Sequence, residues 1–404
     1  MDRDGNHPSI ICWTIVNENW GVDLVHDPDH REWLKDAFAW LKSYDPGRLV
    51  VDNSPLAPSF HVQTDIADYH FYAAFPDNRR AWDRFVDKLA SRSAMLFAPN
   101  GSVQSGNEPL VCSEFGNWGL PDPEALRDPE GREPWWFETG HDWGEGVMHA
   151  HGVENRFADW SLGRVFGSLK GFVEAVQWQQ FRALKYEIEA MRRKSAIAGY
   201  VITEFTDAHW ESNGLLDMRR NRRVFHDMFR TVNADTVIVP QWDRLSYWSG
   251  ETARMTIFVA HGAGAHISGA RLEIELGTTL NLAIPDLIAG TVVSLGRTEL
   301  QVPNEPEASR EPLQFSLKAS DGSVIATNTL EVAIYPRHYR SPAVAEVWSS
   351  DPKWRNRFAA LGYRVPTSPS LESVRVEGRH NDEIDARMSG AADVWCSCLR
   401  ASLT

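Results

Sequence analysis

The stretch RDGNHPSIICWTIVNE, residues 3–18, starts in polar residues and ends in an apolar run closed by an Asn-Glu pair. A short apolar run bounded by turn residues is typical of a buried strand. The same pattern returns downstream as RLVVDNS (48–54), IADYHFY (66–72), PLVCSEFG (109–116) and AGYVITEFTD (198–207).

Between these runs the apolar residues recur at helical spacing, in residues 34–41, 82–89 and 169–191. Strands that alternate with helices predict a parallel sheet with right-handed crossovers. Since a closed barrel of this kind has eight strands, we expect the first part of the chain to represent about the last five strands of a (β/α)8 TIM barrel. The chain then looks truncated at its start.

From about residue 240 the pattern changes to alternating polar and apolar runs separated by Gly, Pro, Asn and Asp. This pattern predicts an antiparallel, immunoglobulin-like β-sandwich. We therefore expect three parts: a partial catalytic barrel in residues 1–238, a β-sandwich in 239–340, and the start of an unassigned α/β segment in 341–404.

The composition limits the classes of partner. The chain has 404 residues, 43% of them hydrophobic and 24% charged, with a net charge of -14. This acidity argues against nucleic acid or an anionic membrane as partner. The first residues do not form a signal peptide, because their apolar stretch is short and follows a proline. An export signal lost with preceding residues would go unseen, so the compartment stays open.

Two carboxylates stand out by position. Glu18 ends the first apolar run and Glu114 ends the fourth. In barrels of parallel strands the chemistry lies at the carboxyl ends of the strands. Hydrolysis of a glycoside with retention needs two carboxyl groups about 5–5.5 Å apart, one acting as acid/base and one as nucleophile. Either residue taken alone is more simply explained as a surface carboxylate, because such residues are common at strand ends.

The surrounding motifs resemble those of glycoside hydrolase family 2, the group of β-galactosidases, β-glucuronidases and β-mannosidases. RDGNHPSIICWTIVNE is similar to the family's acid/base segment, PLVCSEFG to its nucleophile strand, and GYVITEFTDAHWESNGLLD to its last barrel strand. The resemblance covers about residues 3–232. It implies a retaining glycosidase that acts on terminal β-glycosides, with Glu18 as acid/base and Glu114 as nucleophile. It implies no cofactor and no metal.

The same resemblance suggests further substrate-binding residues. Asn17 would hold the sugar 2-hydroxyl, His70 would line the pocket, and Tyr72 would donate a hydrogen bond to Glu114. A packed aromatic fits Tyr72 equally well. Many family members have a Trp where this chain has Thr203, so the aromatic platform expected there would come from elsewhere. The other candidates for contacts with the sugar are Trp118, Glu204 and Trp210.

Other readings remain open. The chain fits a decayed or incomplete remnant that binds carbohydrate without turnover, and also a related barrel enzyme acting inside polysaccharide chains, although the NHPS segment argues against the latter. The unpaired edges of a half barrel would allow a homo-oligomer. The substrate sugar is not determined, but the absence of an Arg or Lys at the strand ends favours a neutral one.

Overall fold

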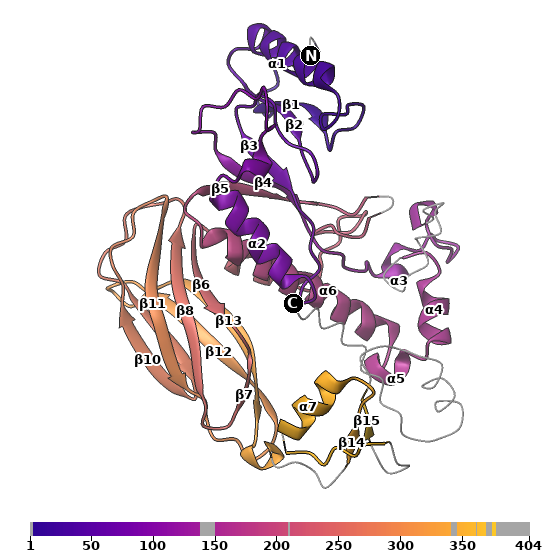
Figure 1. Cartoon of the computed structure of the whole chain (residues 1–404), viewed down its shortest axis with the longest axis vertical. Coiled ribbons are helices and arrows are strands. Elements are labelled where there is room, and N and C mark those ends of the chain that lie inside the picture. The colour runs from indigo at the N-terminus through magenta and orange to yellow at the C-terminus, as the bar shows by residue number, and fades with distance from the viewer. Residues whose placement is uncertain are drawn as a thin grey trace.

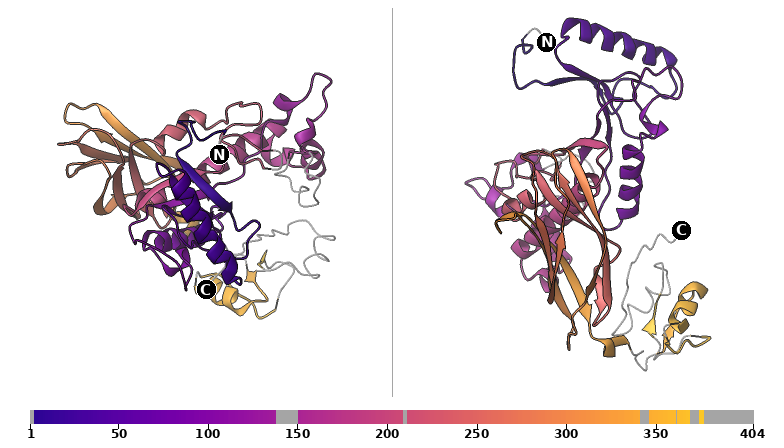
Figure 2. Two further views of the ribbon diagram at one scale, coloured as in Figure 1. Left: turned by 90° about the horizontal axis from the view of Figure 1, so that it is seen from above. Right: turned by 90° about the vertical axis from the view of Figure 1, so that its left-hand side faces the viewer.

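A computed structural model describes residues 3–137, 150–208, 211–340, 346–360, 362–368 and 374–376. The unit of β1 (Cys12–Asn17), α1 (Pro28–Tyr44) and β2 (Leu49–Ser54) lies at one end of the long axis of the molecule. The segment of β14 (Val347–Trp348), α7 (Pro352–Ala360) and β15 (Val374–Arg375) lies at the other end (Figure 1). The antiparallel strands form an elongated body along one side, as the further views confirm (Figure 2).

The five apolar runs of the first part are all strands, and every pairing between them is parallel. They are β1 (Cys12–Asn17), β2 (Leu49–Ser54), β3 (Ala67–His70), β4 (Leu110–Phe115) and β5 (Ile197–Ile202). The helices between them are α1 (Pro28–Tyr44), α2 (Arg79–Ala90) and α6 (Leu169–Arg192), with a 3-10 turn at Ala94–Leu96. The sequence therefore located each of these strands and long helices correctly.

The five strands form two small sheets, β1-β2 and β3-β4-β5. Two backbone hydrogen bonds hold the sheets side by side. The His70 N–H donates to Pro55 O at 2.8 Å, and the Asp65 N–H donates to Val50 O at 2.9 Å. The carboxyl ends of β1 to β4 consequently face one region. Five parallel strands in the described residues make an open arrangement rather than a closed barrel.

A shared core supports β3, β4 and β5. Trp82 of α2, Phe115 of β4 and Leu184 of α6 are almost fully buried in it. Burying side chains of this size contributes about 1.5–3 kcal/mol each. The strand that carries Glu114 therefore packs against α2 and α6 in one core, which makes it a rigid support.

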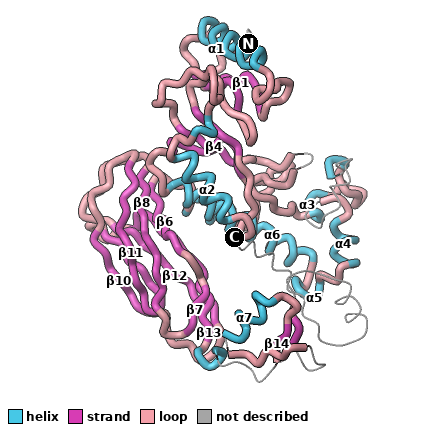
Figure 3. Tube along the Cα trace, in the orientation of Figure 1, coloured by secondary structure: helices cyan, strands magenta, loops and turns pink. Residues whose placement is uncertain are grey.

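The segment between β4 and α6 contains short helices rather than a bare loop. These are α3 (Pro123–Leu126), a 3-10 turn at Trp135–Phe137, α4 (Val153–Asp159) and α5 (Gly163–Phe166). Their apolar residues pack on the start of α6 through Phe172, Val173 and Val176. Figure 3 shows these helices around the end of α6 farther from the antiparallel sheets.

The second part consists of two antiparallel sheets that share a hydrophobic core. One sheet has the order β10-β9-β12-β13-β7, in which β7 joins β13 in parallel, and the other has the order β11-β8-β6. The strands are β6 (Thr236–Trp242), β7 (Ser246–Trp248), β8 (Thr252–His261), β9 (Arg271–Leu276), β10 (Thr278–Ala283), β11 (Thr291–Gln301), β12 (Ser309–Lys318) and β13 (Val324–Tyr335).

Sequence reasoning missed β6, β7 and β10. Pro240 within β6 weakens a strand prediction because proline has no N–H to donate. The strand forms nevertheless, since it lies at the edge of its sheet and pairs only with β8. The domain boundary expected at residue 238 falls inside β6. Residues His226–Thr231, between β5 and β6, form the 3-10 helix η4.

The described residues beyond 336 form a small separate arrangement. It contains a 3-10 turn at Arg337–Arg340, β14 (Val347–Trp348), α7 (Pro352–Ala360) and β15 (Val374–Arg375), and β14 pairs with β15 in parallel. Within the described parts of the chain, every helix is too short or too polar to span a bilayer.

Candidate active site

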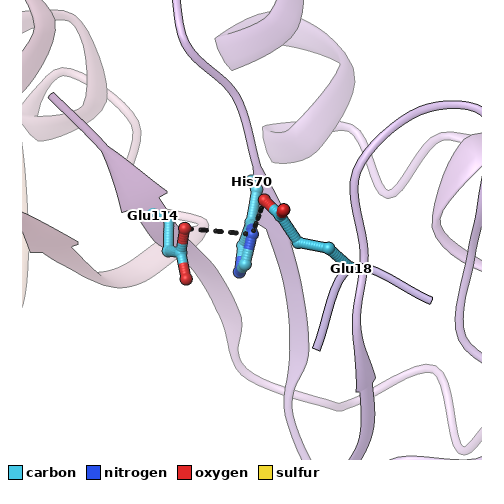
Figure 4. A group of neighbouring side chains, drawn as sticks. All are labelled: Glu18, His70 and Glu114. Atoms are coloured by element: carbon cyan, nitrogen blue, oxygen red, sulfur yellow. Dashed lines mark hydrogen bonds and ion pairs between the residues drawn. The ribbon is translucent and has the colours of Figure 1, made fainter. Parts of the chain in front are cut away.

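Glu18, His70 and Glu114 meet at the carboxyl ends of β1, β3 and β4 (Figure 4). His70 Nδ1 lies 2.9 Å from Glu18 Oε1 and 3.3 Å from Glu114 Oε2. One potential ligand atom from each of the three side chains lies within 4.8 Å of the others. Two carboxylates from strands far apart in sequence thus face each other across a single imidazole.

The turn after β1 gives Glu18 an unusual backbone. Glu18 has φ 50° and Asn19 has φ 64°, a left-handed conformation that costs most non-glycine residues about 1 kcal/mol or more. The Glu18 N–H donates to Ser54 O at 2.9 Å. The fully buried Asn53 donates to Asn19 Oδ1 at 2.7 Å and accepts from the Asn19 N–H at 3.2 Å. The end of β2 therefore holds the strained turn that presents Glu18.

Tyr72 fixes the other carboxylate. Its hydroxyl donates to Glu114 Oε2 at 2.8 Å, the hydrogen bond expected from the sequence. Burial, followed by the Glu114 charge, raises the pKa of the Tyr72 hydroxyl, which therefore stays protonated and able to donate. The Trp118 ring is tilted against Tyr72 at 6.3 Å between centroids and is 44% exposed. Trp118 therefore offers an apolar face close to the carboxylates.

A glycine keeps β4 and the end of β5 close together. A Cβ on Gly116 would lie 2.2 Å from Thr203 O. The Thr203 N–H donates to Phe115 O at 2.9 Å, just after Glu114. Only a residue without a side chain permits this approach, which explains the glycine in the motif PLVCSEFG.

The other candidate substrate-binding residues differ from one another in position and exposure. Asn17 is an exposed residue at the end of β1. Glu204 follows β5, and burial, with the nearby charges of Glu211 and Glu114, raises the pKa of its carboxyl. Its Oε1 is buried and has no hydrogen-bond partner among the described residues. Trp210 lies outside the described residues.

Sequence reasoning did not predict that a group of polar residues is buried beneath the site. Asn53, Ser54, Asp68 and Ser113 follow or interrupt apolar runs, where they read as ordinary strand ends. The structure buries Asn53, Ser54 and Asp68 and joins three strands through the hydrogen bonds of this group. Only the placement of β2 beside the paired strands β3 and β4 brings them together.

Comparison with known proteins adds to this geometry. Residues 1–129 match the family model described as glycosyl hydrolases family 2, TIM barrel domain. The matched segment contains Glu18, His70 and Glu114, so the site lies inside the range that is similar to this family.

Matches to individual proteins cover smaller parts of this chain. A beta-galactosidase of Alteromonas mediterranea is 38% identical over 79 residues, which cover 17% of this chain and 7% of that protein. The match thus spans a small part of the relative. Solved structures similar to the chain include a CARDB domain from Pyrococcus furiosus (12% identity, TM-score 0.21) and a sporulation control protein of Bacillus subtilis (10% identity, TM-score 0.19). Each covers 25% of this chain, with 94% and 50% of the respective structures matched. Scores this low carry no argument about the fold.

Proposed function

We propose that this protein is a retaining glycoside hydrolase that cleaves terminal β-glycosides through a covalent glycosyl-enzyme. The approach of Glu18 and Glu114 carries the proposal, since both side chains have an oxygen within 4.8 Å of the other and of His70. Retaining enzymes place their carboxyl groups about 5–5.5 Å apart, whereas inverting enzymes separate them by about 6.5–9.5 Å. The spacing favours direct attack by a carboxylate over attack by a water held between the two groups.

In this mechanism Glu18 protonates the leaving oxygen and Glu114 attacks the anomeric carbon. The Tyr72 hydrogen bond at 2.8 Å keeps one oxygen of Glu114 engaged and leaves the other to attack. Glu18 then takes a proton from the water that releases the sugar. Asn17, His70, Trp118, Glu204 and Trp210 would contact the substrate.

The charges around the site favour a neutral sugar over a uronic acid. Glu114, Glu204 and Glu211 are close enough for their charges to influence one another. A substrate carboxylate would add a further negative charge to this acidic surface, and like charges at short range repel. Neutral hydroxyls, in contrast, can form hydrogen bonds with these carboxyl groups. We therefore place β-galactosides and β-mannosides before β-glucuronides.

Trapping the glycosyl-enzyme tests the proposal. The chain is incubated with 2-deoxy-2-fluoro aryl glycosides of the three sugars, and the intact mass and peptide map are recorded. We expect a sugar adduct on Glu114, absent in Glu114→Gln and retained in Glu204→Gln. An adduct on Glu204 would refute the assignment of the nucleophile.

A separate test addresses Glu18. Glu18→Ala should lose hydrolysis of phenyl glycosides but keep that of dinitrophenyl glycosides, whose leaving group needs no proton. Added azide should then accelerate turnover and yield a β-glycosyl azide, because a small anion can occupy the space left by the carboxylate. Formation of an α-azide would contradict the double displacement.

The open arrangement of β1 to β5 in the described residues supports one alternative: a carbohydrate-binding remnant without turnover. No adduct with any reagent, together with saturable binding of the same sugars, would favour it. We further propose that residues 1–238 correspond to the later strands of a TIM barrel, that 239–340 form an immunoglobulin-like sandwich and that 341–404 begin another unit. Unpaired edges of the parallel sheets leave a homo-oligomer as a proposal, which light scattering would test.

A further inference from the structure

A buried polar cluster lies beneath His70 and is not used by the mechanism above. Asp68 of β3 is 2% exposed, and its Oδ2 accepts hydrogen bonds from the hydroxyls of Ser54 on β2 and Ser113 on β4. The same Ser54 Oγ lies 2.9 Å from His70 Nε2. Ser54 therefore connects a buried carboxylate to the imidazole that faces Glu18.

The hydrogen-bond donors in this cluster can be counted. A serine hydroxyl has one hydrogen, and Ser54 directs it to Asp68. Ser54 Oγ also lies 3.2 Å from Ser113 Oγ, whose own hydrogen is directed to Asp68. With its hydrogen on Asp68, Ser54 has only lone pairs to offer His70, so Nε2 carries the hydrogen of that contact. Ser113, which makes the same hydrogen bond to Asp68, has no contact with His70 among those described. The hydroxyls of the two serines thus differ in their contact with His70, which only Ser54 makes among the described contacts.

Two serine hydroxyls meet the same oxygen of Asp68, Oδ2, which accepts from both. Burial raises the pKa of its carboxyl, while the charge of His61 and the two serine hydroxyls act in the opposite direction. His61 is itself fully buried, with Nδ1 2.7 Å from Asp52 Oδ1 and Nε2 3.5 Å from Asp68 Oδ1. The His61 ring therefore lies between the buried carboxylates of Asp52 and Asp68.

We propose that Asp68 and Ser54 fix the tautomer of His70 with its hydrogen on Nε2, so that Nδ1 and Glu18 Oε1 share a second proton. The opposite tautomer would place a permanent N–H against Glu18 and stabilise its ionised form. With Nε2 protonated, Nδ1 accepts from Glu18 and favours the carboxylic acid that protonation of a leaving group requires. Asp68 and Ser54 are then positioning residues that act on Glu18 through His70. This catalytic consequence rests on the proposed function, whereas the tautomer does not.

The tautomer is measured directly on the full chain labelled with 15N-histidine, with the His70 signals assigned by their loss in His70→Gln. We expect His70 to show a protonated Nε2 in the unmodified protein and in Ser113→Ala, but not in Ser54→Ala. Asp68→Asn is a second variant that keeps the side-chain shape. Its amide can donate to Ser54, so that the Ser54 hydroxyl turns to Nε2 and the ring proton moves to Nδ1. An unprotonated Nε2 in the unmodified protein, or a tautomer unchanged in both Ser54→Ala and Asp68→Asn, would overturn the proposal.

A kinetic ratio tests the catalytic consequence. Ser54→Ala should lower kcat/KM for a phenyl glycoside by about 10-fold relative to a dinitrophenyl glycoside, a fraction of what a general acid contributes. Ser113→Ala should leave this ratio unchanged, because its lost hydroxyl does not reach His70. Equal ratios in the two variants would show that the tautomer has no role in acid catalysis. If the unmodified chain hydrolyses neither substrate, the proposed function fails while the NMR result still decides the tautomer.

Discussion

Asn53→Ala should loosen the turn that presents Glu18. Asn53 makes two hydrogen bonds to Asn19, at 2.7 and 3.2 Å, and its side chain is fully buried. A neutral hydrogen bond contributes about 1 kcal/mol net, so removing both lowers the free energy of opening the turn by about 2 kcal/mol. Because 1.4 kcal/mol corresponds to a factor of ten, the turn should open about 30 times more often.

Amide hydrogen exchange followed by mass spectrometry measures this opening. Peptides covering residues 13–24 should exchange about 30-fold faster in Asn53→Ala, while peptides from β4 keep their rate. Asn19→Gly is the matched control, since glycine adopts the positive φ without strain and removes the partner side chain. Asn53→Ala should add less in that background than alone. Unchanged exchange over residues 13–24 would refute the role of Asn53 in holding the turn.

Three further outcomes follow from the same structure. Tyr72→Phe should lower kcat/KM by about 10–100-fold, since a hydrogen bond to a charged Glu114 contributes about 1.5–3 kcal/mol; steady-state kinetics on an aryl glycoside measures this. Gly116→Ala should abolish trapping of Glu114 and lower the thermal midpoint, because its Cβ would lie 2.2 Å from Thr203 O. Asp45→Asn should lower the thermal midpoint at pH 7, an effect that declines below about pH 4 and is lost as the pH falls through the lowered pKa of the folded carboxyl.

The sign of the last prediction follows from the partners of Asp45. Hydrogen bonds from Trp13 Nε1 at 2.9 Å and from the Arg48 guanidinium hold the pKa of Asp45 below its usual value. A lowered pKa stabilises the fold above the unfolded value, and this contribution is lost as the pH falls through the folded value. A difference between the variants that persists in acid would contradict this role. For the other two variants, normal kinetics in Tyr72→Phe or normal trapping in Gly116→Ala would be the contradictory results.

Much of the first part was predictable because its signals are local. An apolar run with a polar end marks a strand whether or not its neighbours are known, and Glu18 and Glu114 close two such runs. Parallel strands bring their carboxyl ends to one edge, so the meeting of these carboxylates could be expected. The Tyr72 hydrogen bond was expected through the family resemblance and is present.

Other features depend on contacts that no local pattern records. Pro240 weakens a strand prediction from sequence, and only the sheet order shows that β6 lies at an edge, where a proline is tolerated. Ser54 and Asp68 looked like ordinary strand ends, and their burial arises only when β2, β3 and β4 align. The sequence by itself determined which residues form strands and which carboxylates end them, because these depend on neighbours along the chain. Only the tertiary structure decided how His70 is held between Glu18 and Glu114, because hydrogen-bond geometry depends on which strands pair and in which register.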